Sequence, residues 1–354
     1  MDNLIFVINT GSTSTKIALY NNNEPVFVET IRHPDNELKN FKDVNEQKDY
    51  REKIILNFLK NKNIDLKSIK AISARGGLLR PLESGTYEVN DKMIKDLIEA
   101  KRGLHASHLS AQIGFSIAKS IGIKCYIVDP ISIDEYDKLA RYTGFKEIER
   151  ISLTHALNVK AVHRRFIEQH NMNYHKHNSI IIHLGTGITV ALQKDGKMID
   201  AINSSEEGTF ALDRAGGLPV LQSVKYTLNN NLSYKEFERK IFGNGGIYSY
   251  LKTKDFFKIE KDYLNGDSKT IEIVNAMVYQ IAKDVGALST VVYGKVDSIL
   301  ITGGMAHAKF LVELIKQRIK FIAPVYCYPG EDEMRALAEG VWRVLTGKDS
   351  AKKY

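Results

Sequence analysis

The sequence predicts an α/β protein in which one type of domain occurs twice. A three-strand pattern at Leu4 to Arg32 is repeated about halfway along the chain, at Ser179 to Ser204. In each copy a short apolar run leads through a polar, glycine-rich turn to a second β-prone run, and a further turn leads to a third. Runs punctuated in this way are typical of an antiparallel meander. The repetition of one meander indicates domain duplication.

Length and composition are compatible with two globular domains. The chain has 354 residues, 43% of them hydrophobic and 26% charged, which excludes a disordered protein. The formal net charge is +8, but the 50 Lys and Arg residues are scattered among 42 Asp and Glu. We therefore expect no nucleic-acid partner, because no basic block stands out. A mildly basic protein suits small anionic substrates.

Cysteine usage and hydropathy predict a soluble, cytoplasmic protein. The two cysteines, Cys125 and Cys327, lie in apolar strand-like runs, which predicts buried thiols in a reducing compartment. The amino terminus lacks the layout of a signal peptide. No apolar stretch approaches the ~20 residues that a membrane span needs, so we expect no membrane partner.

The glycine-rich turns of the two meanders predict phosphate binding. Glycine leaves backbone N–H groups uncovered, and clustered N–H groups in a turn attract anions. Hydroxyl groups and a cation surround the first turn, at Ser12, Ser14 and Lys16, while Gly185 and Gly187 form the second. Two such turns can hold one polyphosphate from both sides. A pair of ordinary hairpins is the alternative.

Each half of the chain also carries an arginine beside paired glycines. Arg75 precedes Gly76-Gly77, and Arg214 comes shortly before Gly216-Gly217. An arginine next to flexible backbone can clamp a carboxylate or phosphate through two hydrogen bonds. The alternative is a solvated arginine in a turn, but one such position in each repeat favours a ligand role.

The segment between the meanders is predicted to be mainly helical, with a short strand at 71–73 and one buried strand. That strand, Cys125 to Val128, ends in Asp129 and a proline. A carboxylate at a strand end, beside phosphate-binding turns, suits Mg²⁺, although a turn or capping acid is the alternative. The helices expected in this segment are residues 36–62, which we interpret as a surface helix, 93–100, 107–121 and 133–141.

Histidines open and close the next predicted helix. His155 precedes this helix. It is either a positioned hydrogen-bond donor or a residue that caps the helix. The helix runs to about His170, and the polar tract with His175 and His177 is interpreted as a solvated loop rather than a metal site.

The chain ends in a predicted strand–turn–helix arrangement. Apolar residues at helical spacing predict a long core helix at 269–293. The strand at 296–301 leads to Gly303-Gly304, a turn on which a nucleoside can lie flat against backbone. A last strand at 323–328 and a helix at 334–346 follow.

Seven motifs together resemble the butyrate kinases, in the acetate kinase family of the actin, hexokinase and Hsp70 ATPase superfamily. They are N-T-G-S-T-S-T-K at 9–16, A-R-G-G-L-L-R-P at 74–81, H-A-L-N at 155–158, H-L-G-T-G-I-T at 183–189, D-R-A-G-G-L-P at 213–219, L-I-T-G-G-M-A at 300–306 and Y-P-G-E-D-E-M at 328–334. The resemblance implies two duplicated RNase H-like (actin-like ATPase) domains around a central cleft. Residues 1–153 would form the acyl and phosphoryl side, residues 154–333 would bind nucleotide, and residues 334–354 would return to the first domain.

The resemblance also implies roles for individual residues. The catalytic residues would be Asn9, Arg75, His155 and Arg214. ATP or ADP would be held by Ser12, Ser14, Lys16, His183, Gly185, Gly187, Gly303 and Gly304. Mg²⁺ would be organised by Asp129 and by Glu331 or Glu333. The implied reaction is reversible phosphorylation of butyrate to the acyl phosphate, by a homo-oligomer.

Several other functions remain open at this point. Within the family they are a kinase for branched-chain acids, for acetate or for propionate, and a paralogue with a decayed site. A sugar kinase of the superfamily would need an aspartate base in place of paired arginines. An actin-like or Hsp70-like switch would need further interaction surfaces.

Two residues depart from the family pattern. Thr10 stands where proline is common and Thr186 where glycine is common. Because a β-branched residue does not adopt a positive φ cheaply, we expect Thr186 to shift the second loop. The segment Ser204 to Leu212 also diverges from the usual family sequence, so the carboxylic acid preferred as substrate is not predicted.

Overall fold

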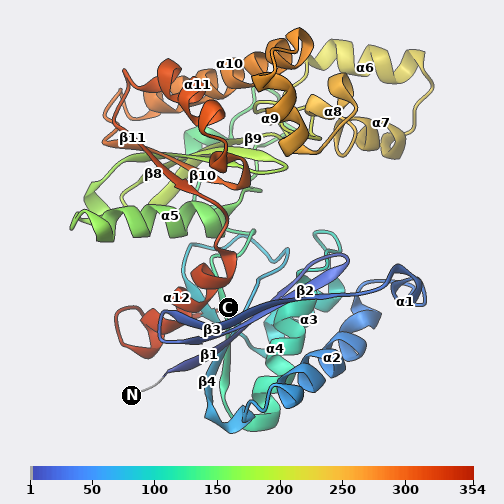
Figure 1. The fold of residues 1–354 in the computed structure, drawn as a ribbon, viewed down its shortest axis with the longest axis vertical. Helices are drawn as coiled ribbons and strands as arrows, with labels where there is room; N and C mark the ends of the chain where they lie inside the picture. Colours follow the sequence, from blue (N-terminus) through green and yellow to red (C-terminus); the bar gives the residue numbers. More distant parts are fainter. Residues whose placement is uncertain (1–2) are drawn as a thin grey trace. The chain divides into compact units, whose positions relative to one another are not determined.

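The computed structural model describes residues 3–354 (Figure 1). The chain forms two compact units, one made of the part up to Asp134 together with Asp332–Tyr354, the other of Glu135–Glu331. The carboxyl-terminal segment therefore belongs to the same unit as the first meander. Within residues 3–354, no helix combines the length and the apolar character needed to cross a bilayer.

The first unit is built on a seven-stranded sheet with the order β12-β5-β6-β4-β1-β2-β3. The first three strands form the predicted antiparallel meander, and β4 and β6 continue the sheet parallel to β1. The strands are β1 (Leu4–Thr10), β2 (Ser14–Asn21), β3 (Glu24–Arg32), β4 (Ile69–Ala74), β5 (Thr86–Glu88), β6 (Lys124–Val128) and β12 (Lys352–Lys353).

Helices cover both faces of this sheet. Helix α4 packs against β1, β4 and β6, with α2 and α3 beside it, and α12 packs on the other face (Figure 1). The strands alternate apolar side chains between these two layers, which buries residues such as Phe6 and Ile72. The helices are α1 (Asp35–Leu38), α2 (Lys48–Asn61), α3 (Asp91–Glu99), α4 (His108–Ile121) and α12 (Glu333–Leu345).

The second unit repeats the strand plan of the first. Its five-stranded sheet has the order β11-β10-β7-β8-β9, with an antiparallel meander followed by two strands parallel to the first. The strands are β7 (Ser179–Leu184), β8 (Ile188–Lys194), β9 (Lys197–Asn203), β10 (Ser298–Gly303) and β11 (Val325–Pro329). A meander extended by parallel strands, present in both units, confirms the predicted duplicated RNase H-like fold.

The helices of the second unit form two layers and a projecting hairpin. Helix α5 packs on one face of the sheet, and α10 with α11 packs on the other, while α6 and α7 extend sideways beyond α8 and α9 (Figure 1). The apolar stripe predicted for 269–293 is the buried face of α10. The helices are α5 (Ala156–Gln169), α6 (Val220–Asn229), α7 (Tyr234–Ile241), α8 (Gly246–Leu251), α9 (Phe256–Leu264), α10 (Ser268–Val291) and α11 (Lys309–Ile319).

The units divide at Asp134/Glu135, earlier than the predicted boundary at 153/154. Hydrogen bonds fasten the following segment to the second unit: the Asp137 N–H donates to the Ile199 carbonyl at 2.9 Å, and the Tyr136 hydroxyl donates to the Ala201 carbonyl at 2.9 Å. The helix predicted at 133–141 is wrong, since only a 3₁₀ turn at Lys138–Arg141 forms. The Asp137 N–H, which a helix would pair internally, binds β9 instead.

The expected burial of both cysteines and the expected exposure of the histidine tract are each only half correct. The Cys125 thiol is buried, and burial raises its pKa, whereas Cys327 is exposed because β11 is an edge strand with an open face. In the histidine tract, His175 is exposed as predicted, but His177 is buried and its Nε2 lies 3.0 Å from the Ser298 hydroxyl.

Candidate active site

The first glycine-rich turn joins β1 to β2. The Gly11 N–H donates to the Ser14 carbonyl at 2.8 Å, which closes the turn tightly. Ser12 lies exposed on this turn, and the exposed Lys16 stands opposite Asn9 in the register of the two strands. The structure therefore brings the residues predicted for the first phosphate loop to one place.

A buried arginine that the sequence motifs did not indicate supports this loop through hydrogen bonds. Arg51, on α2, is fully buried, and its guanidinium donates to the carbonyls of Gly11 at 2.8 Å, Ser12 at 2.8 Å and Ser14 at 3.1 Å. It also donates twice to Gln47, at 2.7 and 3.1 Å. Burial lowers the pKa of Arg51. Its donors are consumed by the protein, so its role is to shape the loop.

We expect Arg51→Met to destabilise the first unit by roughly 3 kcal/mol. The substitution removes the Arg51 donor from the part-buried Gly11 carbonyl and from the buried Gln47 side chain, and each buried polar group left unpaired costs about 1–3 kcal/mol. Lys53→Met is the matched control because Lys53 is exposed on the same helix. Denaturant unfolding of both variants measures the effect. Equal midpoints for the two variants would show that Arg51 does not support the loop.

Three predicted site residues form a polar cluster in the first unit. The Glu333 carboxylate accepts hydrogen bonds from the Asn9 amide at 2.8 Å and from Arg75 at 3.0 Å. Asn9 lies at the carboxyl end of β1, and Arg75 directly follows β4, where ligands bind in open α/β sheets. Glu333 is the first residue of α12, so this helix supplies the carboxylate that orients the arginine.

Asp129 has a different local environment. It follows β6 with a φ of 37° and is 2% exposed. Its Oδ1 accepts from the Gly85 N–H at 2.7 Å, and its own N–H donates to the Gly85 carbonyl at 3.0 Å. These hydrogen bonds stabilise the turn before β5, which is the role expected of an acidic residue in a turn. A role of Asp129 in binding Mg²⁺ stays a prediction.

The second glycine-rich turn, between β7 and β8, lies among converging polar side chains. The Gly185 N–H donates to the Gly187 carbonyl at 3.2 Å. A Cβ on Gly187 would clash with the Arg214 guanidinium, and a Cβ on Gly185 would lie 3.0 Å from the Glu331 carboxylate. Glycine at these positions lets both side chains approach the backbone closely, and a larger residue would have to displace them.

Arg214 differs from Arg51 in having few protein partners. One Nη donates to the Ser205 hydroxyl at 3.1 Å, and the guanidinium lies 4.5 Å from the centre of the Phe242 ring. Its buried Nε makes no hydrogen bond to any residue in the described part of the chain. Burial lowers the pKa of Arg214, and Asp213 opposes this shift. A partly desolvated cation with donors to spare suits an anionic ligand.

Two stacked histidines lie beside the second turn. The rings of His155 and His183 are 4.2 Å apart, and His155 Nδ1 lies 2.9 Å from the Thr189 hydroxyl. His155 occupies the N-cap position of α5, but its side chain makes no capping hydrogen bond. His183 Nε2 lies 3.1 Å from Glu331 Oε1, and its buried Nδ1 makes no hydrogen bond within residues 3–354. His155 therefore does not cap α5 through its side chain, and its role as a positioned donor stays a prediction.

The glycines after β10 adjoin the same loop. Gly303 has a φ of 98°, and a Cβ there would clash with the Leu184 backbone at the end of β7. Gly303 and Gly330 exchange backbone hydrogen bonds of 3.1 and 2.9 Å. A Cβ on Gly304 would meet no atom within 4 Å, so open space lies beside it. All the site residues predicted in the second unit thus gather around the ends of β7 and β10.

The two threonines that depart from the family pattern are unstrained. Neither Thr10 nor Thr186 has a positive φ, and a shift of the second loop at Thr186 stays a prediction. Thr10 is buried, and its hydroxyl donates to the Ala106 carbonyl at 2.6 Å while its N–H donates to the Ser110 hydroxyl at 2.8 Å. These bonds connect the end of β1 to the start of α4.

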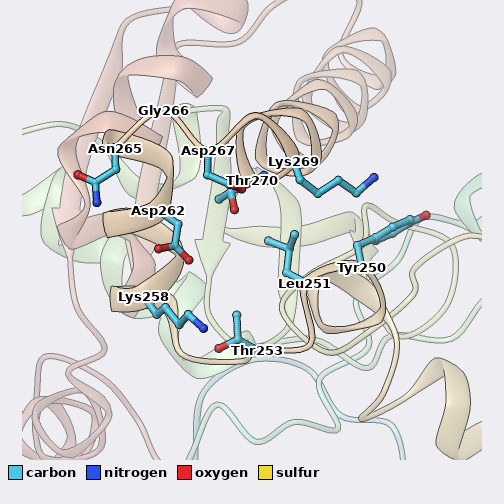
Figure 2. Close-up of a pocket in the computed structure, with 10 residues that line it drawn as sticks. All are labelled: Tyr250, Leu251, Thr253, Lys258, Asp262, Asn265, Gly266, Asp267, Lys269 and Thr270. Atoms are coloured by element: carbon cyan, nitrogen blue, oxygen red, sulfur yellow. Dashed lines mark hydrogen bonds between the residues drawn. The ribbon is translucent and has the colours of Figure 1, made fainter.

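Two hollows of the second unit lie in its helical part. One, of ≈ 560 Å³, is lined by side chains from α8, α9 and the start of α10 and includes no predicted site residue (Figure 2). The other, of ≈ 600 Å³, is lined by α6, α7 and the segment of Ala215 and Gly217 that follows Arg214. Only the second adjoins the predicted site.

Comparison with known sequences identifies the family. The sequence model of the Acetokinase family matches residues 147–327. The chain belongs to the acetokinase family. Butyrate kinase 2 and butyrate kinase 1 of Clostridium acetobutylicum are each 44% identical to it over 351 residues, which cover 99% of this chain and 99% of each relative.

Comparison with solved structures agrees with this family. Porphyromonas gingivalis acetate kinase superposes with a TM-score of 0.76 at 18% identity, over 97% of this chain and 100% of that one. Entamoeba histolytica acetate kinase superposes with a TM-score of 0.77 at 15% identity, over 96% of this chain and 98% of that one. The fold is therefore the acetate kinase fold.

Proposed function

We propose that the protein is a butyrate kinase, which reversibly transfers the terminal phosphoryl group of ATP to the carboxylate of butyrate. The observation that carries this proposal is the 44% identity to two butyrate kinases over nearly the whole of each chain. Family membership and fold support a phosphotransferase with a carboxylate acceptor.

The reaction needs no general base. A carboxyl group has a pKa near ~4 and is an anion at neutral pH. One carboxylate oxygen forms a bond to the γ-phosphorus while the bond from that phosphorus to the bridging oxygen breaks, and ADP keeps the electron pair. The obstacle is repulsion between an anion and a polyphosphate, so catalysis consists mainly of positioning and charge neutralisation.

We assign this neutralisation to cationic and hydrogen-bonding residues. Arg214 has unused donors beside the Gly187 backbone, and His155 is oriented by Thr189. Arg75 is held by Glu333, which also orients the Asn9 amide. These contacts support roles for Arg214, His155, Arg75 and Asn9 in positioning the transferring group and offsetting its charge.

The glycine-rich turns are assigned to the nucleotide. Backbone and hydroxyl groups at Ser12 and Ser14, with Lys16, would contact phosphate oxygens, and His183, Gly185 and Gly187 would do so in the second unit. The open space beside Gly304, next to Gly303, would accept the adenosine. The unpartnered buried Nδ1 of His183 supports a polar ligand at this turn.

Mg²⁺ is the cation we propose for the nucleotide phosphates. It binds proteins through one or two carboxylates and otherwise through water and substrate phosphates. The residue set fits this requirement, because Glu331 places a carboxylate beside Gly185, and Glu333 and Asp129 are the other candidates. Residues 3–354 contain no cluster of three or more acidic, histidine or cysteine side chains suited to a metal, so substrate oxygens would complete the coordination. Bound Mg²⁺ would offset phosphate charge.

Trapping the acyl phosphate tests the proposed function. We expect hydroxamate to form when the protein is mixed with butyrate, MgATP and hydroxylamine. Acids of two to five carbons and branched acids serve as comparisons, and because one methylene is worth only ~1–3 kcal/mol, neighbours of butyrate should also react. ATP consumption without hydroxamate for any acid would refute a carboxylate kinase. A clear preference for acetate, propionate or a branched acid would change the proposed substrate and leave the proposed reaction unchanged.

A further inference from the structure

A loop of the second unit is tied to helix α10 by two side chains. This loop, residues 204–213, leads as turns and irregular backbone from β9 to the arginine assigned to charge neutralisation. The Thr209 N–H donates to the Asp284 carboxylate at 2.9 Å. The Phe210 N–H donates to the side-chain oxygen of Gln280 at 3.2 Å. Gln280 and Asp284 are four residues apart in α10, so both acceptors lie on the same face of this helix.

Helix α10 gives the loop a fixed support. It has 24 residues, and its apolar stripe lies in the core of the second unit. Its N-terminus is capped by Asp267, whose side chain accepts from the Thr270 N–H at 2.8 Å. Burial, with a smaller contribution from the nearby Glu207, raises the pKa of Asp284 to about 6, so this carboxylate is still mostly ionised at neutral pH. An ionised acceptor makes a stronger hydrogen bond than a neutral one.

The same loop contacts Arg214 and the residues next to it. The Ser205 hydroxyl accepts from an Arg214 Nη at 3.1 Å. The Ala211 N–H donates to the Arg214 carbonyl at 2.9 Å, and the Gly208 carbonyl accepts from the Gly217 N–H at 2.8 Å. A displacement of the loop would therefore move both the backbone that carries the arginine and the hydroxyl that orients its guanidinium.

Close packing strengthens this connection. A Cβ on Gly216 would clash with the Gly208 carbonyl. A Cβ on Gly217 would clash with the Glu207 carbonyl. The loop and the two glycines that follow Arg214 therefore lie with their backbones directly against each other, and neither stretch can shift alone.

The loop has a second attachment, through Arg150. Glu207 accepts two hydrogen bonds from the Arg150 guanidinium, at 2.8 and 3.0 Å. Arg150 also donates to the Ala201 carbonyl of β9 at 2.8 Å. Loss of the Asp284 carboxylate would therefore leave one end of the loop attached, while the backbone around Thr209 would lose its charged acceptor.

We propose that Asp284 is a positioning residue for phosphoryl transfer, which holds the loop of residues 204–213 on α10 and thereby fixes the place of the Arg214 guanidinium. Asp284 acts through the loop rather than on the substrate. This assignment rests on the proposed function, because it gives Asp284 its effect through the arginine that offsets charge on the transferring group. A misplacement of about 1 Å at a reacting centre can cost about 10²-fold in rate.

Steady-state kinetics of Asp284→Ala and Asp284→Asn in the hydroxamate assay test the proposal. We expect Asp284→Ala to lower kcat about 10²-fold with little change in KM for MgATP, because the nucleotide contacts are made by other residues. Asp284→Asn should keep most of the wild-type kcat, since its amide oxygen can still accept the Thr209 N–H. Wild-type kcat in Asp284→Ala, or the same loss in Asp284→Asn, would overturn the proposal.

Val274→Ala is the control for loss of stability alone. Val274 is fully buried on the same helix, ten residues before Asp284. This variant should unfold at a lower temperature than the wild type and keep a kcat close to it. A fall in kcat as large as that of Asp284→Ala would show that any weakening of α10 slows turnover, which would overturn a specific role for Asp284.

A double variant tests whether Asp284 acts through Arg214. Arg214→Ala/Asp284→Ala should turn over as slowly as Arg214→Ala alone, because no guanidinium remains to be positioned. A further loss of the size seen for Asp284→Ala alone would show that Asp284 acts through another group, and the proposal would be wrong.

Modification of arginines by phenylglyoxal reports the place of Arg214 without turnover. Followed by mass spectrometry, Arg214 should react several times faster in Asp284→Ala than in the wild type, because its guanidinium loses its fixed place beside Ser205. The exposed Arg318 should react equally in both proteins. Equal reactivity of Arg214 in the two proteins would overturn the positioning role. Failure of the wild type to form hydroxamate from any acid would instead refute the proposed function, so the two failures are distinguishable.

Discussion

Arg214→Ala is expected to lose about 10³-fold or more in turnover, with little change in stability. An arginine that offsets charge on a transferring phosphoryl group contributes on this scale. Within residues 3–354 its guanidinium makes one hydrogen bond, to Ser205, one ring contact, with Phe242, and a long ion pair of 4.0 Å with Asp213. Few contacts are therefore lost on truncation. The hydroxamate assay measures turnover, and thermal unfolding measures stability.

Arg318→Ala is the control for this prediction. Arg318 is an exposed arginine on α11 of the same unit, where it contacts Tyr279. Its removal should leave turnover within a factor of two, since surface substitutions rarely reach the site. If Arg214→Ala retained near wild-type turnover, the assignment of Arg214 would be wrong even though the family assignment would stand.

Lys160→Met is expected to destabilise the second unit by about 3–5 kcal/mol. Lys160 and Glu135 are an ion pair with side chains 0% and 2% exposed, joined at 2.6 Å. Removing one partner of a buried pair leaves the other charge without compensation, which costs about this amount. Denaturant unfolding checks the value. Lys95→Met is the control, because the Lys95–Glu99 pair is solvated and should be worth below about 1 kcal/mol.

The double variant Lys160→Met/Glu135→Gln separates charge from packing. Glu135 also accepts a hydrogen bond from the Met198 N–H at 2.8 Å, and a glutamine oxygen can still accept it. We expect the double variant to recover much of the stability that the single variant loses. A double variant as unstable as Lys160→Met would show that shape, rather than an uncompensated carboxylate, sets the cost.

The parts of the site that were predictable from sequence are formed by residues that lie close together in the chain. The meanders follow from apolar runs and turn residues, and the glycine turns follow directly from the residues between strands. The coarse gathering of His183, Gly185 and Gly303 also follows, because parallel neighbouring strands end at one edge of a sheet. Such features depend on neighbours in sequence and on strand order.

Contacts between distant segments were not predictable. Arg51 lies among charged residues of α2 and looks solvated, although its spacing of four and eight residues from the buried Ile55 and Leu59 places it on the inward face. Nothing local indicates that Glu333 meets Asn9 and Arg75. The close approach of Arg214 to the backbone of Gly187 likewise comes from another segment of the chain.

The errors share a physical cause. Helical spacing at 133–141 suggested a helix, but the segment is held by hydrogen bonds to β9, which lies far along the sequence. The apolar run around Cys327 suggested a covered strand, whereas the position of β11 at the sheet edge leaves this thiol open. Both outcomes depend on tertiary placement.

The buried guanidinium of Arg51 gives the first phosphate loop its shape before any nucleotide arrives. The carbonyl groups of Gly11, Ser12 and Ser14 are already tied to a fixed point inside the protein. A loop preorganised in this way loses little conformational entropy when it captures a ligand. More of the contact energy therefore remains available as affinity.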